Sequence, residues 1–167
     1  KMKLEKVLIT ARPINMASIG VAKANGGKIV RQTEECVYLV IPLVNYSDVK
    51  LETEDLILRK ARLEDWRALY HNLWKHEESA KYMLWRPKKS EEEARECMNR
   101  TVDFQKTEKY AFLVYLRKTG EPIGFAGMKD AGDGVYGETG IALGPEFVGK
   151  GYGRQIFNVL TEEAKRM

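Results

Sequence analysis

Short apolar runs and one helical pattern alternate along the front of the chain. In chain order, the predicted elements are a strand over residues 4–10, a helix over 15–25, and strands over 28–32 and 36–43. Asn15 is a favourable helix cap, and Gly26 with Gly27 ends the helix in the manner of a glycine C-cap. The pattern therefore predicts the order strand, helix, strand, strand.

A polar, turn-prone stretch over residues 44–54 separates this part from a second series of elements. The series opens with a predicted strand over 56–61. A helix follows, with a core-facing stripe made of Leu63, Trp66, Leu69, Tyr70, Leu73 and Trp74. After an irregular segment over 79–89, Ser90 and Glu93 form a predicted capping box for a second helix. The predicted inward residues of that helix are Ala94, Cys97, Met98 and Val102.

Three strands are predicted next, over residues 110–116, 123–128 and 135–143, with turns at 118–122 and 130–134. Strands joined by such short turns are expected to form an antiparallel meander. A last helical pattern carries Ile156, Phe157, Leu160 and Ala164 on one side. The second series is therefore a strand, two helices, three strands and a final helix.

A glycine-rich stretch, Gly144 to Gln155 (GPEFVGKGYGRQ), joins the last strand to the last helix. At the start of a helix, free backbone N–H groups and the positive end of the helix dipole converge on one spot, which suits a phosphate or pyrophosphate. Glycines at 149, 151 and 153 remove the Cβ atoms that would keep such a ligand away from the backbone. The stretch therefore predicts an anion site.

Two common phosphate motifs do not fit this stretch. Gly144, Gly149 and Lys150 have the spacing of a P-loop, but Gly151 stands where a Ser or Thr would hold magnesium. The dinucleotide fingerprint also fails, because the glycines are spaced Gly-x-Gly-x-Gly and lie late in the chain. Gly151 therefore argues against a magnesium-dependent nucleotide-phosphate binder.

Composition narrows the class of protein. The 167 residues, 44% of them hydrophobic, suffice for one domain with a core. A net charge of +4 favours anionic ligands without making a nucleic-acid-binding stripe, so we expect no nucleic-acid partner. No apolar run approaches the ~18 residues of a membrane span, and the start does not look like a signal peptide. We therefore expect no membrane partner either.

The cysteines and histidines predict no metal or disulfide chemistry. Cys36 and Cys97 are expected to be reduced core thiols, as in a cytoplasmic protein. His71 and His76 lie in one charged helical stretch with no Cys or carboxylate at metal-site spacing. A cytoplasmic protein without a metal is the resulting prediction.

The glycine-rich stretch resembles the acetyl-CoA signature of the GNAT N-acetyltransferases, Gln/Arg-x-x-Gly-x-Gly/Ala. Gly151 and Gly153 take the glycine places, and Val148 stands where the family usually has Gln or Arg. The resemblance implies an α/β (α+β) acyl-CoA N-acyltransferase fold with a mixed central sheet flanked by helices. It also implies acetyl-CoA as the cofactor, with no metal.

The predicted elements have the GNAT order only when the chain is rotated, from residue 51 to 167 and onward from residue 1. Asn15-x-x-Ser18 and Gly26-Gly27 sit where Rim-type enzymes, the ribosomal-protein N-terminal acetyltransferases, have Asn-x-x-Ser and a helix-ending Gly. Residues 1–43 then resemble the C-terminal part of a GNAT domain and 51–167 its N-terminal, acetyl-CoA-binding part. Residues 44–50 would be a linker, and the two parts together one domain-equivalent.

Three explanations of the rotated order stay open. The protein is a circular permutant, or a piece cut across a tandem array in which complete sites form between chains, or a sequence whose order reflects how it was assembled. Exchange of segments between chains would give a homodimer.

The resemblance also implies the cofactor contacts. Acetyl-CoA would lie in a notch where strand 135–143 splays from strand 4–10, its pyrophosphate on backbone amides and its pantetheine arm paired with the strand end. Lys150 and Arg154 would add positive charge. The implied cofactor residues are Ile141, Ala142, Leu143, Val148, Gly149, Lys150, Gly151, Tyr152, Gly153 and Arg154, with Asn15 and Ser18.

Three catalytic residues follow from the same resemblance. Glu138 is the candidate base, because Glu138, Gly140 and Leu143 match the family's Glu-x-Gly-x-x-Leu strand motif. Ser18 is the candidate acid, since Ala22 stands where many GNAT enzymes have a Tyr. Asn15 is either a helix cap alone or a cap that would also touch the pantetheine, and we favour the second interpretation. The structural alternatives are an outward-facing Glu138 that pairs with a neighbouring strand and a Ser18 bonded to its own helix.

The acceptor cleft is expected in the irregular segment before the second helix. Tyr82, Met83 and Trp85 are the candidate acceptor residues, although aromatic residues in such a loop also seal the end of a core. The predicted function is transfer of an acetyl group to a primary amine, either a protein N-terminus or a small molecule. The alternative is a non-catalytic acyl-CoA-binding module.

Overall fold

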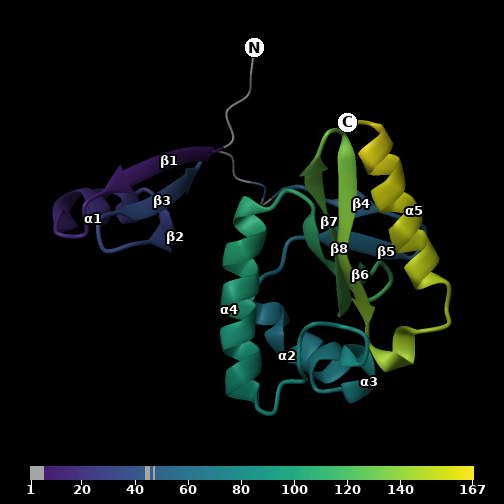
Figure 1. The fold of residues 1–167 in the computed structure, drawn as a ribbon. Coiled ribbons are helices and arrows are strands. Elements are labelled where there is room, and N and C mark those ends of the chain that lie inside the picture. The colour runs from purple at the N-terminus through teal and green to yellow at the C-terminus, as the bar shows by residue number, and fades with distance from the viewer. Residues whose placement is uncertain (1–5, 44–45, 47) are drawn as a thin grey trace. The chain divides into compact units, whose positions relative to one another are not determined.

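The computed structural model describes residues 6–43, 46 and 48–167, and it divides the chain into two compact units. The first is Lys1–Asn45 and the second is Tyr46–Met167. Each unit has its own sheet, and each is described by itself (Figure 1). Among the described residues, none of the helices has both the length and the apolar character needed to cross a bilayer.

The first unit is a three-stranded antiparallel sheet with one helix. Its elements are β1 (Lys6–Ala11), α1 (Met16–Ala24), β2 (Lys28–Gln32) and β3 (Val37–Pro42), and the strand order is β1-β3-β2. Asn15 caps α1 as predicted, its Oδ1 accepting the Ser18 N–H at 3.1 Å. Gly26 follows the helix with φ +81°, a conformation that favours glycine. The predicted order is confirmed, while residues 4 and 5 of the predicted first strand lie outside the described residues.

The second unit is built on a five-stranded antiparallel sheet of order β4-β5-β6-β7-β8. Its strands are β4 (Leu51–Glu52), β5 (Leu56–Arg59), β6 (Ala111–Leu116), β7 (Pro122–Gly132) and β8 (Val135–Leu143). The predicted meander of the last three strands is confirmed. The short strand β4 was missed, because its surroundings read as a polar turn. Both described sheets are antiparallel, so a mixed sheet and a rotated chain order remain predictions.

Helices cover both faces of this second sheet (Figure 1). They are a 3₁₀ turn (Leu63–Asp65), α2 (Trp66–Leu69), a π-helical turn (Tyr70–Trp74), α3 (Glu77–Ala80), α4 (Glu91–Thr107), a 3₁₀ turn (Pro145–Phe147) and α5 (Tyr152–Lys165). The predicted helix over the Leu63–Trp74 stripe is therefore not one regular helix. Leu69, Leu73 and Trp74 are buried, but Leu63 is exposed.

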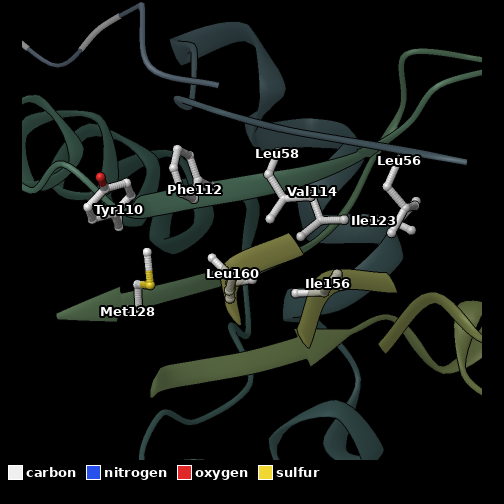
Figure 2. Packing of buried hydrophobic residues seen from close by; sticks show 10 residues of the cluster. Leu56, Leu58, Tyr110, Phe112, Val114, Ile123, Met128, Ile156 and Leu160 are labelled. Atoms are coloured by element: carbon white, nitrogen blue, oxygen red, sulfur yellow. The ribbon is translucent and has the colours of Figure 1, made fainter. Parts of the chain in front are cut away.

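Alternating side chains of β6 enter two different cores. Phe112 and Val114 pack with Ile156 and Leu160 of α5, as Figure 2 shows. Leu113 and Tyr115, on the opposite face, belong to the cluster that includes Leu69, Leu73, Ala94 and Met98 from α2, the π-helical turn and α4. Side chains of a strand point alternately to its two faces, so one strand can serve both cores.

Two buried polar groups tie the second unit together. Lys60 Nζ donates to the carbonyl oxygens of Glu108, Lys109 and Ala111 at 2.7, 2.8 and 2.9 Å. Gln105 of α4 accepts the Ala61 N–H at 2.7 Å through its Oε1. These bonds fix the end of β5 to the start of β6 and to α4.

Candidate active site

The glycine-rich turn between β8 and α5 is open to solvent where the sequence predicted an anion site. Gly149 and Gly151 have φ of +82° and +81°, and Gly151 is the cap residue of α5. A Cβ atom built at Gly149, Gly151 or Gly153 meets no heavy atom within 4 Å. At Gly144 the reason for glycine is different, because a Cβ would lie 2.0 Å from the Asn72 carbonyl oxygen. Gly149 and Gly151 are required by their positive φ. Gly153 has no such requirement, and the space beside its Cα is open.

The first turn of α5 directs polar backbone groups toward this opening. Gln155 N–H bonds to the Gly151 carbonyl oxygen at 3.2 Å, so the N–H groups of residues 152–154 have no earlier turn of α5 to bond. Lys150 and Arg154 are exposed beside them, and Lys150 Nζ lies 5.5 Å from the centre of the Phe147 ring. Free amides, the helix dipole and two cations fit a phosphate or pyrophosphate group.

Gln155 anchors the start of α5 to the loop between β4 and β5. Its Oε1 accepts the Thr53 hydroxyl at 2.6 Å and the Asp55 N–H at 3.2 Å, and its Nε2 donates to Asp55 at 2.7 Å. The turn is thereby held at both ends, with Gly144 N–H bonded to the Ile123 carbonyl at the other. Sequence reasoning gave Gln155 no such role, because its partners lie far away in the chain.

A cleft of about 680 Å³ lies beside β8 and gathers several of the predicted residues. Its lining consists of Tyr82, Met83, Leu84, Trp85, Phe125, Glu138, Thr139, Gly140, Ile141 and Phe157. The candidate base Glu138, the candidate acceptor residues and the candidate cofactor residue Ile141 therefore share one cleft. Leu84, Phe125, Thr139 and Phe157 were not predicted to line it.

Phe157 is a correction to the sequence analysis. The helical pattern predicted it on the core side of α5, but it is 59% exposed and lines the cleft. Ile156 and Leu160 fill the core side instead, and both are buried. A helical pattern does not decide whether an apolar residue next to a buried one faces the core or the solvent. For Phe157 the packing of α5 decides it.

A β-bulge sets the direction of Glu138. Ala126 faces Ile141 and Met128 faces Glu138, so one β7 residue lies opposite two residues of β8. Gly140, one of those two, has φ +120°, and a Cβ there would come within 3.1 Å of Met83 Cε. Bulges re-aim side chains at functional sites. Here the bulge directs Glu138 and Thr139 to the cleft.

The Glu138 side chain is exposed, and within the described part of the chain it forms no hydrogen bond or ion pair. This exposure and the register pairing of Glu138 with Met128 of β7 also agree with the structural alternative, so its role as base stays a prediction. A carboxylate without a partner in a cleft is free to accept a proton from a ligand.

One edge of β8 has no partner strand among the described residues, because β8 ends the sheet order. Half of the N–H and C=O groups of an edge strand point away from its sheet and can pair with an extended ligand. Ile141, Ala142 and Leu143 lie at the end of this edge. Ser79 of α3 donates to the Leu143 carbonyl at 3.2 Å and fixes that end.

Asn15 and Ser18 belong to the first unit, where both side chains are exposed. The Asn15 carboxamide accepts the Ser18 backbone N–H, whereas no hydrogen bond of the Ser18 hydroxyl is seen among the described residues. The structural alternative of a Ser18 hydroxyl bonded to its own helix is thus not observed. The roles of both residues toward a cofactor stay predictions.

Comparison with known protein families identifies the family of this chain. The family model described as an acetyltransferase (GNAT) domain matches residues 55–167, which include β8, the glycine-rich turn and α5. The chain belongs to the GNAT acetyltransferases. GNAT acetyltransferases use acetyl-CoA, and the open glycines, free amides and cations of the turn fit its pyrophosphate. Among the described residues there is no cluster of His, Cys, Asp or Glu that could hold a metal ion.

Solved structures similar to this GNAT chain share its fold. A GNAT-family acetyltransferase from Bacillus anthracis has a TM-score of 0.59 at 19% identity, over 71% of this chain and 67% of that one. A protein described as a ribosomal-protein-serine acetyltransferase from Vibrio cholerae has a TM-score of 0.59 at 21% identity, with the same coverage. A GCN5-related N-acetyltransferase from Brucella melitensis has a TM-score of 0.60 at 13% identity, over 70% and 54%. No curated protein matches the chain.

Proposed function

We propose that the protein is an acetyl-CoA-dependent N-acetyltransferase that acts on a primary amine, either a protein N-terminus or a small molecule. The observation that carries the proposal is the position of Glu138. Its side chain has no partner among the described residues and lies in a cleft beside β8, and the same strand leads directly into the glycine-rich turn. A proton acceptor and a pyrophosphate cradle are thus held by one continuous segment.

Different residues of this segment bind the cofactor and transfer the proton. The backbone amides of residues 149–154, with Lys150 and Arg154, bind the pyrophosphate, and the free edge of β8 at Ile141 to Leu143 pairs with the pantetheine arm. Acetyl-CoA, when bound, supplies an acetyl thioester. Glu138 takes the proton that the attacking amine loses, directly or through a water. The Val148 side chain is exposed, but its N–H already donates to the Pro145 carbonyl oxygen at 3.4 Å, so the amides after it supply the donors.

In the proposed reaction, one bond forms as another breaks, and each proton has a donor and an acceptor. The amine nitrogen forms a bond to the acetyl carbon while the bond from that carbon to sulfur breaks. Ser18 or a water gives a proton to the departing thiolate, and Asn15 caps the helix that carries Ser18. Tyr82, Met83 and Trp85 contact the acceptor.

The proposal extends to the first unit. Its strand, helix, strand, strand order and its Asn15-x-x-Ser18 motif support a Rim-type C-terminal part. The two units are then one GNAT domain-equivalent, in one chain or by exchange of segments in a homodimer. Sedimentation of the full chain distinguishes these forms: a mass near 19.1 kDa contradicts the exchanged homodimer, and twice that mass supports it.

A thiol-release screen tests the proposed activity. The full chain is mixed with acetyl-CoA and with peptide N-termini, polyamines or aminoglycosides, and free CoA thiol is measured over time. The proposal predicts release that depends on an acceptor amine. Tight CoA binding without acceptor-dependent release would instead identify a non-catalytic acyl-CoA-binding module.

A further inference from the structure

A second cavity, of about 280 Å³, lies between α4 and the sheet of the second unit. Its walls are mainly apolar and aromatic, with Trp74, Trp85, Phe104, Leu113 and Phe125 among them. An apolar cavity of about 150 Å³ in a protein core is large enough to bind benzene. This cavity is therefore large enough for an aromatic ring or a branched alkyl group that carries a substituent.

The cavity borders the cleft that contains Glu138. Trp85, Phe125 and Thr139 line both spaces. The rings of Trp85 and Phe125 meet edge to face, with centres 6.3 Å apart, and form the shared wall. Thr139 is the neighbour of Glu138 on β8. The cavity and the cleft therefore adjoin at these three residues.

Hydrogen-bond donors stand among the apolar walls. The indole Nε1–H of Trp85 is buried and has no acceptor among the described residues. Leaving such a buried donor unpaired is unfavourable, so it marks a place where a ligand oxygen gains affinity. Gln105 is 3% exposed, and because its Oε1 accepts the Ala61 N–H, its Nε2 remains as a donor. Lys88 adds a third donor at the cavity wall.

We propose that this cavity is the side-chain subsite for the acceptor amine. It takes an apolar aryl or branched alkyl group that carries a hydrogen-bond-accepting oxygen, a carbonyl or a carboxylate. The inference rests on the proposed amine acetylation for its biological meaning. Binding of the side-chain group itself is a separate property and is measured without acetyl-CoA.

The binding test uses the full chain and the amine-free probe 4-ethylbenzamide, with ethylbenzene as the probe that lacks the oxygen. Calorimetry or ligand-observed NMR is expected to show at least tenfold tighter binding of the benzamide. Trp85→Phe, which removes the indole N–H and keeps a ring, is expected to abolish most of this difference. Equal affinity for both probes, or no binding of either, overturns the proposal.

A cavity-filling variant locates the binding. Cys97 is half-buried and lines the cavity from α4, and Cys97→Leu is expected to weaken 4-ethylbenzamide binding at least tenfold. Glu96→Leu is the matched control on α4, since the Glu96 side chain is 73% exposed, and it leaves binding unchanged. Thermal unfolding checks that both variants fold. Unchanged probe affinity in a folded Cys97→Leu protein overturns the proposal.

The activity arm separates this inference from the proposed function. With 4-(2-aminoethyl)benzamide as acceptor, kcat/KM is expected to exceed that of phenethylamine about tenfold and that of ethanolamine by more. Cys97→Leu lowers the first value and leaves ethanolamine unchanged. Thiol release without any preference among the amines contradicts the subsite alone. Absence of release with every amine contradicts the proposed acetylation, and the probe measurements then decide whether the cavity binds such groups.

Discussion

At the scale of single residues, the glycines of the turn after β8 serve different physical needs. Gly149 and Gly151 have positive φ, which any L side chain adopts only with strain. Gly153 has no such constraint, and a Cβ there meets nothing within 4 Å. Its hydrogen side chain is thus not required by the fold, which leaves close approach of a ligand as the physical reason for it.

Gly153→Ala separates ligand approach from folding. The variant is expected to weaken CoA binding about tenfold, which is ~1.4 kcal/mol, because the new methyl group occupies ligand space. Its free energy of unfolding is expected to stay equal or rise, since alanine favours a helix more than glycine does. Calorimetric titration with CoA and denaturant unfolding measure the two quantities.

The control for this variant is Asn158→Ala, at an exposed position of the same helix. It is expected to leave CoA binding unchanged. If Gly153→Ala binds CoA as well as the wild type does, the turn does not hold the pyrophosphate as described.

At the scale of elements, β8 joins the cleft to the turn, and its bulge depends on Gly140. Gly140→Ala is expected to destabilise the protein by about 1–3 kcal/mol, because alanine at φ +120° is strained and its Cβ would contact Met83. Denaturant unfolding measures the loss. Gly137→Ala is the control on the same strand, since Gly137 has no positive φ and its nearest neighbour is 4.0 Å away. Equal stability of the two variants would contradict the bulge geometry.

The link between β5 and β6 predicts a pH dependence. Burial lowers the pKa of Lys60 to about 8. Between about pH 8 and the ordinary lysine value the unfolded chain binds more protons than the folded one, so stability contributed by this site rises with pH. Above about pH 10 Tyr115 acts in the opposite direction, because burial and the Asp65 hydrogen bond raise its pKa.

The measurement is the difference in unfolding free energy between wild type and Lys60→Met from pH 7 to 10. We expect this difference to grow in favour of the wild type by on the order of 1 kcal/mol, after allowance for solvent screening. Lys165→Met, an exposed lysine, is the control. A difference that stays flat across this range would show that Lys60 titrates as an ordinary surface lysine.

The elements also show what the sequence could and could not predict. The bounds of β8, residues 135–143, were predicted fully, because turn residues flank a long alternating strand. The helix expected over the Leu63–Trp74 stripe is broken into 3₁₀, α and π turns, since tertiary packing overrides local periodicity. The cavity under α4 had no sequence signal, because residues far apart in the chain form its walls.

At the scale of the whole molecule, the family match at residues 55–167 lies within the second unit. That unit contains Glu138, the cleft and the turn, so the family match includes all of these features. The resemblance of the turn to the GNAT signature predicted the fold, whereas the roles of the turn's residues stay predictions. The sequence could not establish the relation of the first unit to the second, because each unit has a separate core.

The measurement that tests the central claim most directly is acetylated amine formed per acetyl-CoA consumed, compared between wild type and Glu138→Gln. The account predicts stoichiometric acetylated amine in the wild type and a kcat/KM lower by about 10²–10⁴-fold in the variant, with CoA affinity unchanged. Calorimetry with CoA supplies the second quantity. A Glu138→Gln protein that acetylates the amine as fast as the wild type would contradict the account.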